Sequence, residues 1–151
     1  MSKLEYTDAD AGLASGMAAF EAKHFARAMQ LLYPYAEQGY APAQYHVAIM
    51  YQNGLGITQS DVAAWKWMHD AAQQGFALAQ HGLGFMYLEG ECIDQDSTKA
   101  AIWFKQAAEQ GLAGSMLALA GLYETGNGVT QDPTEAQRLY QLAGAWLLSR
   151  S

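Results

Sequence analysis

The 151-residue sequence has a single cysteine, three prolines and only eight basic residues. A single cysteine excludes a disulfide within the chain and suits a reducing compartment. Fifteen acidic residues outweigh the eight lysines and arginines, so the formal charge is −7. The sequence therefore lacks the basic surface expected of a protein that binds nucleic acid or an anionic membrane, and it favours a basic or neutral partner.

The sequence also lacks a recognisable signal peptide or membrane span. Its polar start, MSKLEYTDAD, has no apolar core behind a basic end. The longest largely apolar run, near residues 116–123, is far too short to cross a bilayer. We therefore expect a cytoplasmic protein without membrane insertion, or a periplasmic one if a leader has been removed.

A unit that recurs every 36 residues dominates the sequence instead. Alanine, tyrosine, glycine and tryptophan return in register, as Ala43, Tyr51, Gly54, Ala64 and Trp67, then Ala79, Tyr87, Gly90, Ala100 and Trp103, then Tyr123, Gly126 and Ala136. A fixed period of this length indicates a solenoid of stacked units, none of which can bury its apolar face alone. We predict an all-α protein, one domain over residues 1–151, with about four helical hairpins (eight helices) in repeats near 8–42, 43–78, 79–114 and 115–149, and a C-terminal capping helix.

Local signals give the expected ends of these helices. The first helices should begin near Ala43, Ala79 and Ser115 and end at Gly54, Gly90 and Gly126, and the N-cap candidates of the second helices are Ser60, Asp96 and Asp132. Glu135 would complete a capping box with Asp132. Cys92 replaces the second loop glycine of the middle copy, which predicts a different loop shape there. Pro34 falls inside a predicted helix, where we expect a kink but no break.

The recurring pattern A-x-x-x-L-G-x-x-Y-x-x-G-x-G-V, followed by A-x-x-W/L-F/Y-x-x-A-A-x-x-G, resembles the Sel1-like repeat, a relative of the tetratricopeptide repeat. The resemblance covers roughly residues 10–148, and LLYPYAEQGYAPAQ looks like the opening hairpin common in bacterial members. It implies an α/α right-handed superhelix of antiparallel helix pairs that serves protein–protein interaction. It implies no chemistry and no cofactor.

Comparing the copies with one another separates a predicted core from a predicted free face. Slots that keep their size form the core, namely Val47/Leu83/Leu119, Ala48/Gly84/Ala120, Met50/Met86/Leu122 and Tyr51/Tyr87/Tyr123 on the first helices, and Ala64/Ala100/Ala136, Trp67/Trp103/Leu139, Met68/Phe104/Tyr140 and Ala71/Ala107/Ala143 on the second. The outer residues of the second helices, such as Lys66, Lys105 and Arg138, are predicted to be solvated. Trp65, Ile102 and Leu142 are apolar exceptions that would suit a packing surface.

A second stripe on the first helices changes character from copy to copy. In a stack of hairpins this face lines the concave groove, where such proteins usually bind. We predict a site there for a peptide or protein segment, with an apolar floor and a polar rim. Its residues are Tyr45, Ile49, Gln52, Asn53, His81, Phe85, Leu88, Glu89, Leu117 and Glu124. The alternative is that tight curvature buries these side chains against one another.

Nothing in the sequence predicts catalysis or metal binding. The four histidines make no H-E-x-x-H spacing, and neither S-x-x-K nor a phosphate-binding G-x-x-x-x-G-K-[ST] occurs. His46 is interpreted as a packing histidine, His81 as a binding contact and Cys92 as an ordinary thiol. We predict a non-catalytic adaptor, regulatory or immunity-type, with no metal or cofactor. The alternatives are a structural homo-oligomer joined through Trp146, Leu147 and Leu148, which otherwise cap the array, and more remotely a hydrolase like the β-lactamase-like members of the family.

Overall fold

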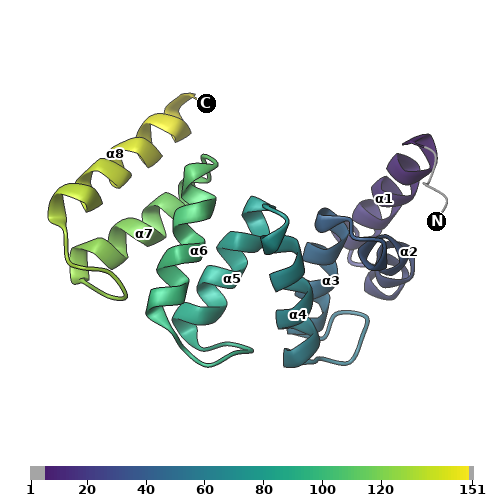
Figure 1. The fold of residues 1–151 in the computed structure, drawn as a ribbon. Coiled ribbons are helices and arrows are strands. Elements are labelled where there is room, and N and C mark those ends of the chain that lie inside the picture. Colours follow the sequence, from purple (N-terminus) through teal and green to yellow (C-terminus); the bar gives the residue numbers. More distant parts are fainter. Residues whose placement is uncertain (1–5, 150–151) are drawn as a thin grey trace. The chain divides into compact units, whose positions relative to one another are not determined.

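The computed structural model describes the backbone of residues 6–149 and the side chains of residues 11–145 (Figure 1). Eight α-helices fill this range, and no residue within it forms a β-strand. They are α1 (Tyr6–Glu21), α2 (Phe25–Glu37), α3 (Ala41–Asn53), α4 (Asp61–Gln73), α5 (Ala77–Glu89), α6 (Ser97–Glu109), α7 (Ala113–Thr125) and α8 (Pro133–Ser149). The predicted all-α fold with eight helices is therefore confirmed.

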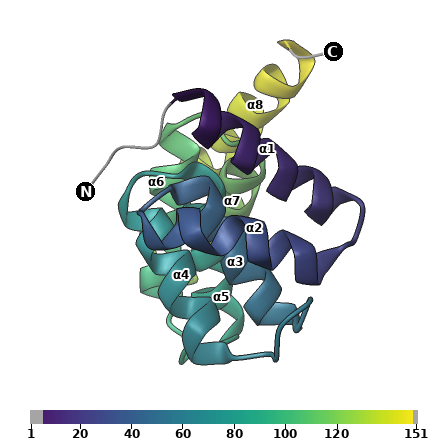
Figure 2. The same ribbon diagram turned by 90° about the vertical axis from the view of Figure 1, so that its right-hand side faces the viewer.

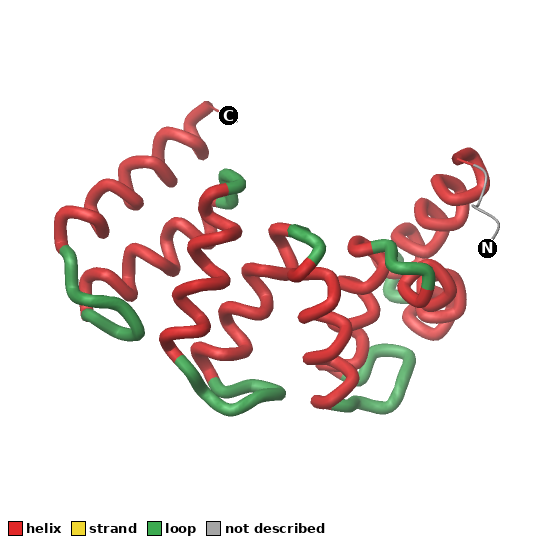
Figure 3. Tube along the Cα trace, in the orientation of Figure 1, coloured by secondary structure: helices red, strands yellow, loops and turns green. Residues whose placement is uncertain are grey.

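The chain divides into two compact units, Met1–Gln74 and Gly75–Ser151. The first unit holds the hairpins α1–α2 and α3–α4, and α2 also packs on α3 (Figure 2). The second unit holds α5–α6 and α7–α8, with α6 packed on α7. Short loops join consecutive helices throughout (Figure 3).

Each of the last three hairpins uses the same local devices at its ends. The predicted N-caps are confirmed, because Ser60, Asp96 and Asp132 each accept a hydrogen bond from the backbone N–H three residues later, at 3.1–3.2 Å. The predicted capping box is wrong in its second half. The Glu135 carboxylate bonds Arg138 at 2.6 Å, while the Asp132 N–H donates to the Tyr123 carbonyl at 2.9 Å.

The first helices begin two residues before the predicted starts. They start at Ala41, Ala77 and Ala113 after the extended residues Tyr40, Phe76 and Leu112, none of which caps the helix with its side chain. No polar N-cap residue marks these starts, and the prediction did not use Pro42, which lies in the first turn of α3. The glycine stops are confirmed: Gly54, Gly90 and Gly126 follow the helices in the left-handed conformation.

The loop that contains Cys92 has the same backbone as its counterparts, so the predicted difference in shape is wrong. Cys92 has φ 69°, against 69° for Gly56 and 75° for Gly128. Hydrogen bonds on both sides hold it there, from Glu91 N–H to Met86 O at 2.9 Å and from Asp96 N–H to Tyr87 O at 2.8 Å. These bonds recur in the other loops and outweigh the resistance of a side chain to positive φ.

The predicted core is largely confirmed. Val47, Leu83 and Phe104 are fully buried, and the ring of Phe104 lies so close to Gly84 that a Cβ there would be 2.7 Å from it. Tyr51, Trp103 and Tyr123 are only half-buried. Tyr140 was predicted to be core but is 37% exposed. The reason is that α6 packs against both α5 and α7, whereas α8 packs chiefly against α7.

Two other sequence features have clear structural outcomes. Helix α2 runs unbroken through the exposed Pro34, which confirms that the proline does not end the helix, and the expected kink stays a prediction. A hydrogen-bonded pair of glutamines, one buried and one exposed, recurs in each unit and was not predicted from the sequence. The Gln74 amide donates to the Gln44 carbonyl oxygen at 2.8 Å, and the Gln110 amide does the same to Gln80, also at 2.8 Å. The matching slots of the last repeat hold Met116 and Trp146, so both polar partners are absent there together.

Candidate functional site

In the second unit, the predicted binding face begins with a run of apolar side chains on α5. Leu78 is 44% exposed, and Phe85 and Leu88 are half-buried. Phe85 packs edge-on against Phe104, with ring centroids 4.9 Å apart, so its position is held by the core. Leu78 was missed from the sequence, although it precedes His81 by three positions and therefore shares its helix face.

His81 joins this face of α5 to α7. Its Nδ1 lies 2.7 Å from the Ser115 hydroxyl, and a Cβ on Gly114 would lie 3.3 Å from its ring. The ring also packs edge-on against Phe85 at 5.0 Å. Burial lowers the pKa of His81, so its neutral form is favoured. His81 therefore holds the two helices together at this face.

The α7 part of the face is more open. Leu117 is 44% exposed, and a Cβ built on Gly121 would meet nothing within 4 Å. Glu124 is exposed and accepts a hydrogen bond from Tyr140, which raises the pKa of that tyrosine. We call Leu78, His81, Phe85, Leu88, Leu117 and Gly121 the first-helix stripe. The exposed carboxylates of Glu89 and Glu124 lie at its ends on α5 and α7.

The predicted residues of the first unit lie on α3. Tyr45, Ile49 and Gln52 are half-buried, and burial raises the pKa of Tyr45. Asn53 is exposed and its side-chain amide donates to the Ile49 carbonyl at 3.1 Å. The structure thus brings together the predicted residues of α5 and α7 in one unit and those of α3 in the other. That all ten form one continuous floor stays a prediction.

The residues considered for chemistry have ordinary structural roles. His46 is a packing histidine, as predicted: its Nδ1 lies 2.9 Å from the Pro42 carbonyl oxygen, and its ring packs edge-on against Phe20 at 4.9 Å. Cys92, the single cysteine of the chain, is half-buried. Within the part of the chain that the structure describes, no group of three or more His, Cys, Asp or Glu side chains is arranged to hold a metal ion.

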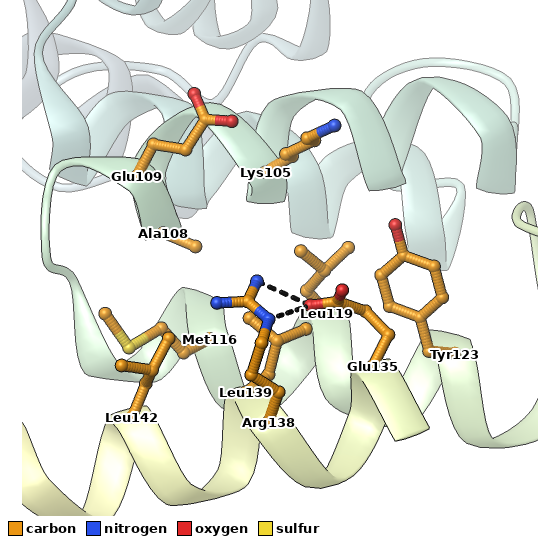
Figure 4. A pocket seen from close by; sticks show the side chains of 10 residues that line it. All are labelled: Lys105, Ala108, Glu109, Met116, Leu119, Tyr123, Glu135, Arg138, Leu139 and Leu142. Carbon is orange, nitrogen blue, oxygen red and sulfur yellow. Dashed lines mark hydrogen bonds and ion pairs between the residues drawn. The ribbon is translucent and has the colours of Figure 1, made fainter. Parts of the chain in front are cut away.

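A cavity of about 240 Å³ lies on a different side of the second unit, between α6, α7 and α8 (Figure 4). Its lining residues are Lys105, Ala108, Glu109, Met116, Leu119, Tyr123, Glu135, Arg138, Leu139 and Leu142. In Figure 4, α6 carries Lys105 and Glu109 on one side, and α8 carries Arg138 and Leu142 on the other. Arg138 bonds Glu135 at 2.5–2.6 Å, which raises the pKa of Arg138.

A second cavity, of about 180 Å³, adjoins the first. The two share Lys105, Leu119 and Tyr123, and the second is completed by Thr98, Ala101, Ile102, Gly128 and Val129. We call the two cavities together the outer groove. The sequence predicted a solvated surface here. The signal that pointed to the groove was the pair of apolar exceptions Ile102 and Leu142, which prove to lie at its two cavities.

No helix within residues 6–149 is both long and apolar enough to cross a membrane. A comparison with curated proteins gives no significant match. A comparison with protein families matches the Sel1 repeat three times, at residues 41–76, 77–112 and 113–145. These repeats begin where α3, α5 and α7 begin.

Solved structures share the fold. A Sel1 repeat protein from Oxalobacter formigenes has 31% sequence identity and a TM-score of 0.84, with 89% of this chain and 55% of that chain covered. The protein c5321 of uropathogenic Escherichia coli strains, a protective antigen with an SLR fold, has 36% identity and a TM-score of 0.76, with 78% and 25% covered. Cysteine-rich protein B of Helicobacter pylori, at 19% identity, has a TM-score of 0.59, with 75% of this chain and 86% of that chain covered.

The present chain thus spans about half the length of the first of these proteins and a quarter of the second. Sel1-repeat proteins generally act as scaffolds for protein interactions and are typically non-catalytic. Three consecutive repeats in register with the helical hairpins cover most of the sequence. The chain belongs to the Sel1-repeat family.

Proposed function

We propose that the protein is a non-catalytic adaptor that holds a segment of a partner protein against the first-helix stripe. The observation that carries this proposal is the exposure of Leu78 and Leu117, each 44% open to solvent on neighbouring first helices. Exposed aliphatic groups beside a half-buried phenylalanine form an apolar floor that a partner can cover. A partner segment that presents apolar side chains would bury them there.

The stripe is suited to binding because its side chains are already held in place. The Phe85 ring packs on Phe104, and His81 is held at 2.7 Å from the Ser115 hydroxyl. Groups that are ordered before binding lose little further conformational entropy when the partner arrives. A preformed floor therefore favours tighter binding for the same buried area.

Charge favours a basic or neutral partner. Glu89 and Glu124 are exposed at the ends of the stripe, and the whole chain carries −7. Like-charged partners would be repelled and oppositely charged ones steered toward the surface. A cytoplasmic regulatory or immunity-type adaptor that binds a basic or neutral segment is consistent with these charges.

Affinity capture from the native cell, followed by mass spectrometry, tests the proposal with three proteins. Leu117→Asp places a charge on the stripe at an exposed position, so the fold should survive. Val62→Asp is the matched control, because Val62 is 79% exposed on α4 in the other unit. We expect the wild type and the control to capture the same partner and Leu117→Asp to lose it. Equal capture by all three proteins, with equal melting temperatures, would show that the stripe is not the binding surface.

A homo-oligomer joined through Trp146, Leu147 and Leu148 remains the second candidate. These three side chains lie outside the described residues, and they follow the last repeat in the sequence. Light scattering separates the two functions. A dimer that becomes a monomer on Trp146→Ser, with capture unchanged, would favour assembly through this segment.

A further inference from the structure

We infer that the outer groove is a second docking site, for a peptide segment that carries one carboxylate between two apolar side chains. This inference goes beyond the adaptor function proposed above, because the groove involves α6, α7 and α8 and contains none of the first-helix stripe. Three observations carry it: the apolar residues in its two cavities, the size of those cavities, and the unpaired donors where they meet.

The apolar residues are exceptions to the repeat. Leu142 occupies the slot of Asp70 and Gln106, and Ile102 occupies the slot of Lys66 and Arg138. In the structure Leu142 is 43% and Ile102 52% exposed. Side chains that keep so much surface in water contribute little to the core, so packing within the chain does not account for them. Two such exceptions in adjoining cavities indicate a surface that something else covers.

The cavities are the right size for single side chains. At about 240 and 180 Å³, each is smaller than the roughly 300–1,000 Å³ of a typical small-molecule site. Met116 and Leu119 give the larger cavity an apolar floor, and Val129 and Leu119 line the smaller one. An aliphatic or aromatic side chain in each cavity would bury apolar area on both sides of the contact. The occupant that fits this shape is a chain that places one apolar group in each cavity.

The chemistry between the two apolar groups is set by Lys105 and Tyr123, which line both cavities. Among the described side chains, neither the Lys105 ammonium nor the Tyr123 hydroxyl has a hydrogen-bond partner. Figure 4 shows the Tyr123 hydroxyl directed toward the α6 side, where Lys105 lies. The remaining cation, Arg138, is already neutralised by Glu135. An ammonium and a hydroxyl with free donors match a carboxylate.

The same charges limit how acidic the occupant is. Glu109 lines the larger cavity on the same helix as Lys105, one turn away, and would repel a second carboxylate. The chain as a whole carries −7 and opposes a strongly acidic partner at long range. A single carboxylate opposite Lys105, with uncharged neighbours, satisfies both the local and the overall charge. This is why the inference specifies one acidic group and not an acidic stretch.

A displayed library of random peptides of about twelve residues tests the inference, with the Leu117→Asp protein as bait so that binding to the first-helix stripe is suppressed. We expect selected peptides to carry an Asp or Glu between two apolar residues. Synthetic versions should bind with affinities measurable by fluorescence anisotropy. Replacing the acidic residue by its amide should weaken binding about tenfold or more, as expected for a charge-assisted hydrogen bond.

The chain supplies matched variants for the protein side. Leu142→Gln, Ile102→Gln and Lys105→Gln each install the residue that another repeat uses at the same slot, as Gln106, Gln30 and Gln141 do, so all three should fold. Each variant should lower the affinity for the acidic peptide about tenfold. Lys105→Gln should have little effect on the affinity for the amide peptide. Val62→Thr and Lys66→Gln, also taken from matching slots, change exposed residues of α4 and should have no effect.

Two results would overturn the inference. One is selected peptides without the acidic residue, or no selected peptide at all. The other is peptide binding that the three groove variants leave unchanged while their helicity and melting temperatures match the wild type. The outcome can be told apart from that of the adaptor proposal, because Leu142, Ile102 and Lys105 lie outside the first-helix stripe and Leu117 lies outside the outer groove.

Discussion

Gly84 and Gly121 show how the same residue type has opposite roles at two helical positions. A Cβ on Gly84 would lie 2.7–2.9 Å from the ring of Phe104, which is fully buried. A Cβ on Gly121 would meet nothing within 4 Å. We expect Gly84→Ala to destabilise the protein by about 1–3 kcal/mol through overpacking. Gly121→Ala should stabilise it by up to about 1 kcal/mol through helix propensity. Urea denaturation measures both, and a loss of equal size in the two variants would contradict the packing described at Gly84.

His81 makes stability depend on pH in a defined direction. Burial lowers its pKa below the ordinary value of 6.5, so the unfolded chain binds more protons than the folded one below about that pH. The contribution of neutral His81 to the free energy of unfolding is therefore complete above pH 6.5. It is lost as the pH falls toward the lowered pKa of His81 in the folded protein. Replacing His81 by Leu, the residue at the matching position 117, should remove this part of the slope. Urea denaturation from about pH 7.5 to 5 checks it, and an unchanged slope in the variant would exclude His81 as its source.

The loops between the two helices of each of the last three hairpins share a positive φ at one position, which is glycine in two loops and Cys92 in the third. Gly128 has φ 75°, and a Cβ there would overlap the carbonyl group of Ser97. Gly128→Ala combines that overlap with the left-handed conformation and should cost about 2–4 kcal/mol. Cys92 already adopts φ 69° with a side chain, so Cys92→Gly should relieve strain and gain about 0.5–1 kcal/mol. Melting temperatures that moved in the same direction for both variants would refute this account.

The helices also show what a single sequence predicts and what it does not. Val47, Leu83 and Phe104 were identified as core because a shared packing problem keeps side-chain size constant at matching slots. Gln80 is buried as well, but an isolated glutamine indicates a surface residue. Its partner Gln110 lies 30 positions further along the chain. Only the packed hairpin shows that the pair satisfies itself.

The candidate sites differ in the same way. The first-helix stripe depends on the spacing of residues within one helix, so the sequence predicted most of it. The outer groove depends on gaps between three helices, and the sequence places its residues in separate classes. It predicts Leu119 and Tyr123 as core residues and Lys105 and Arg138 as solvated ones. Comparing repeat positions gives no information about a gap between helices, so the cavity of about 240 Å³ is found only in the structure.

For the molecule as a whole, the charge of −7 gives the two candidate surfaces opposite responses to salt. A basic partner at the first-helix stripe would be steered by the overall field, so its association rate should fall as ionic strength rises from about 0.05 to 0.5 M. A peptide with one carboxylate approaches the outer groove against that field and is attracted only close to Lys105. Screening removes the long-range repulsion first, so its association rate should not fall over the same range. Stopped-flow measurements of the association rates of the two ligands test this difference. For the basic partner at the first-helix stripe, the dissociation rate should change little with salt. If the association rates of both ligands fell equally with salt, the idea that the overall field governs one surface and Lys105 governs the other would be wrong.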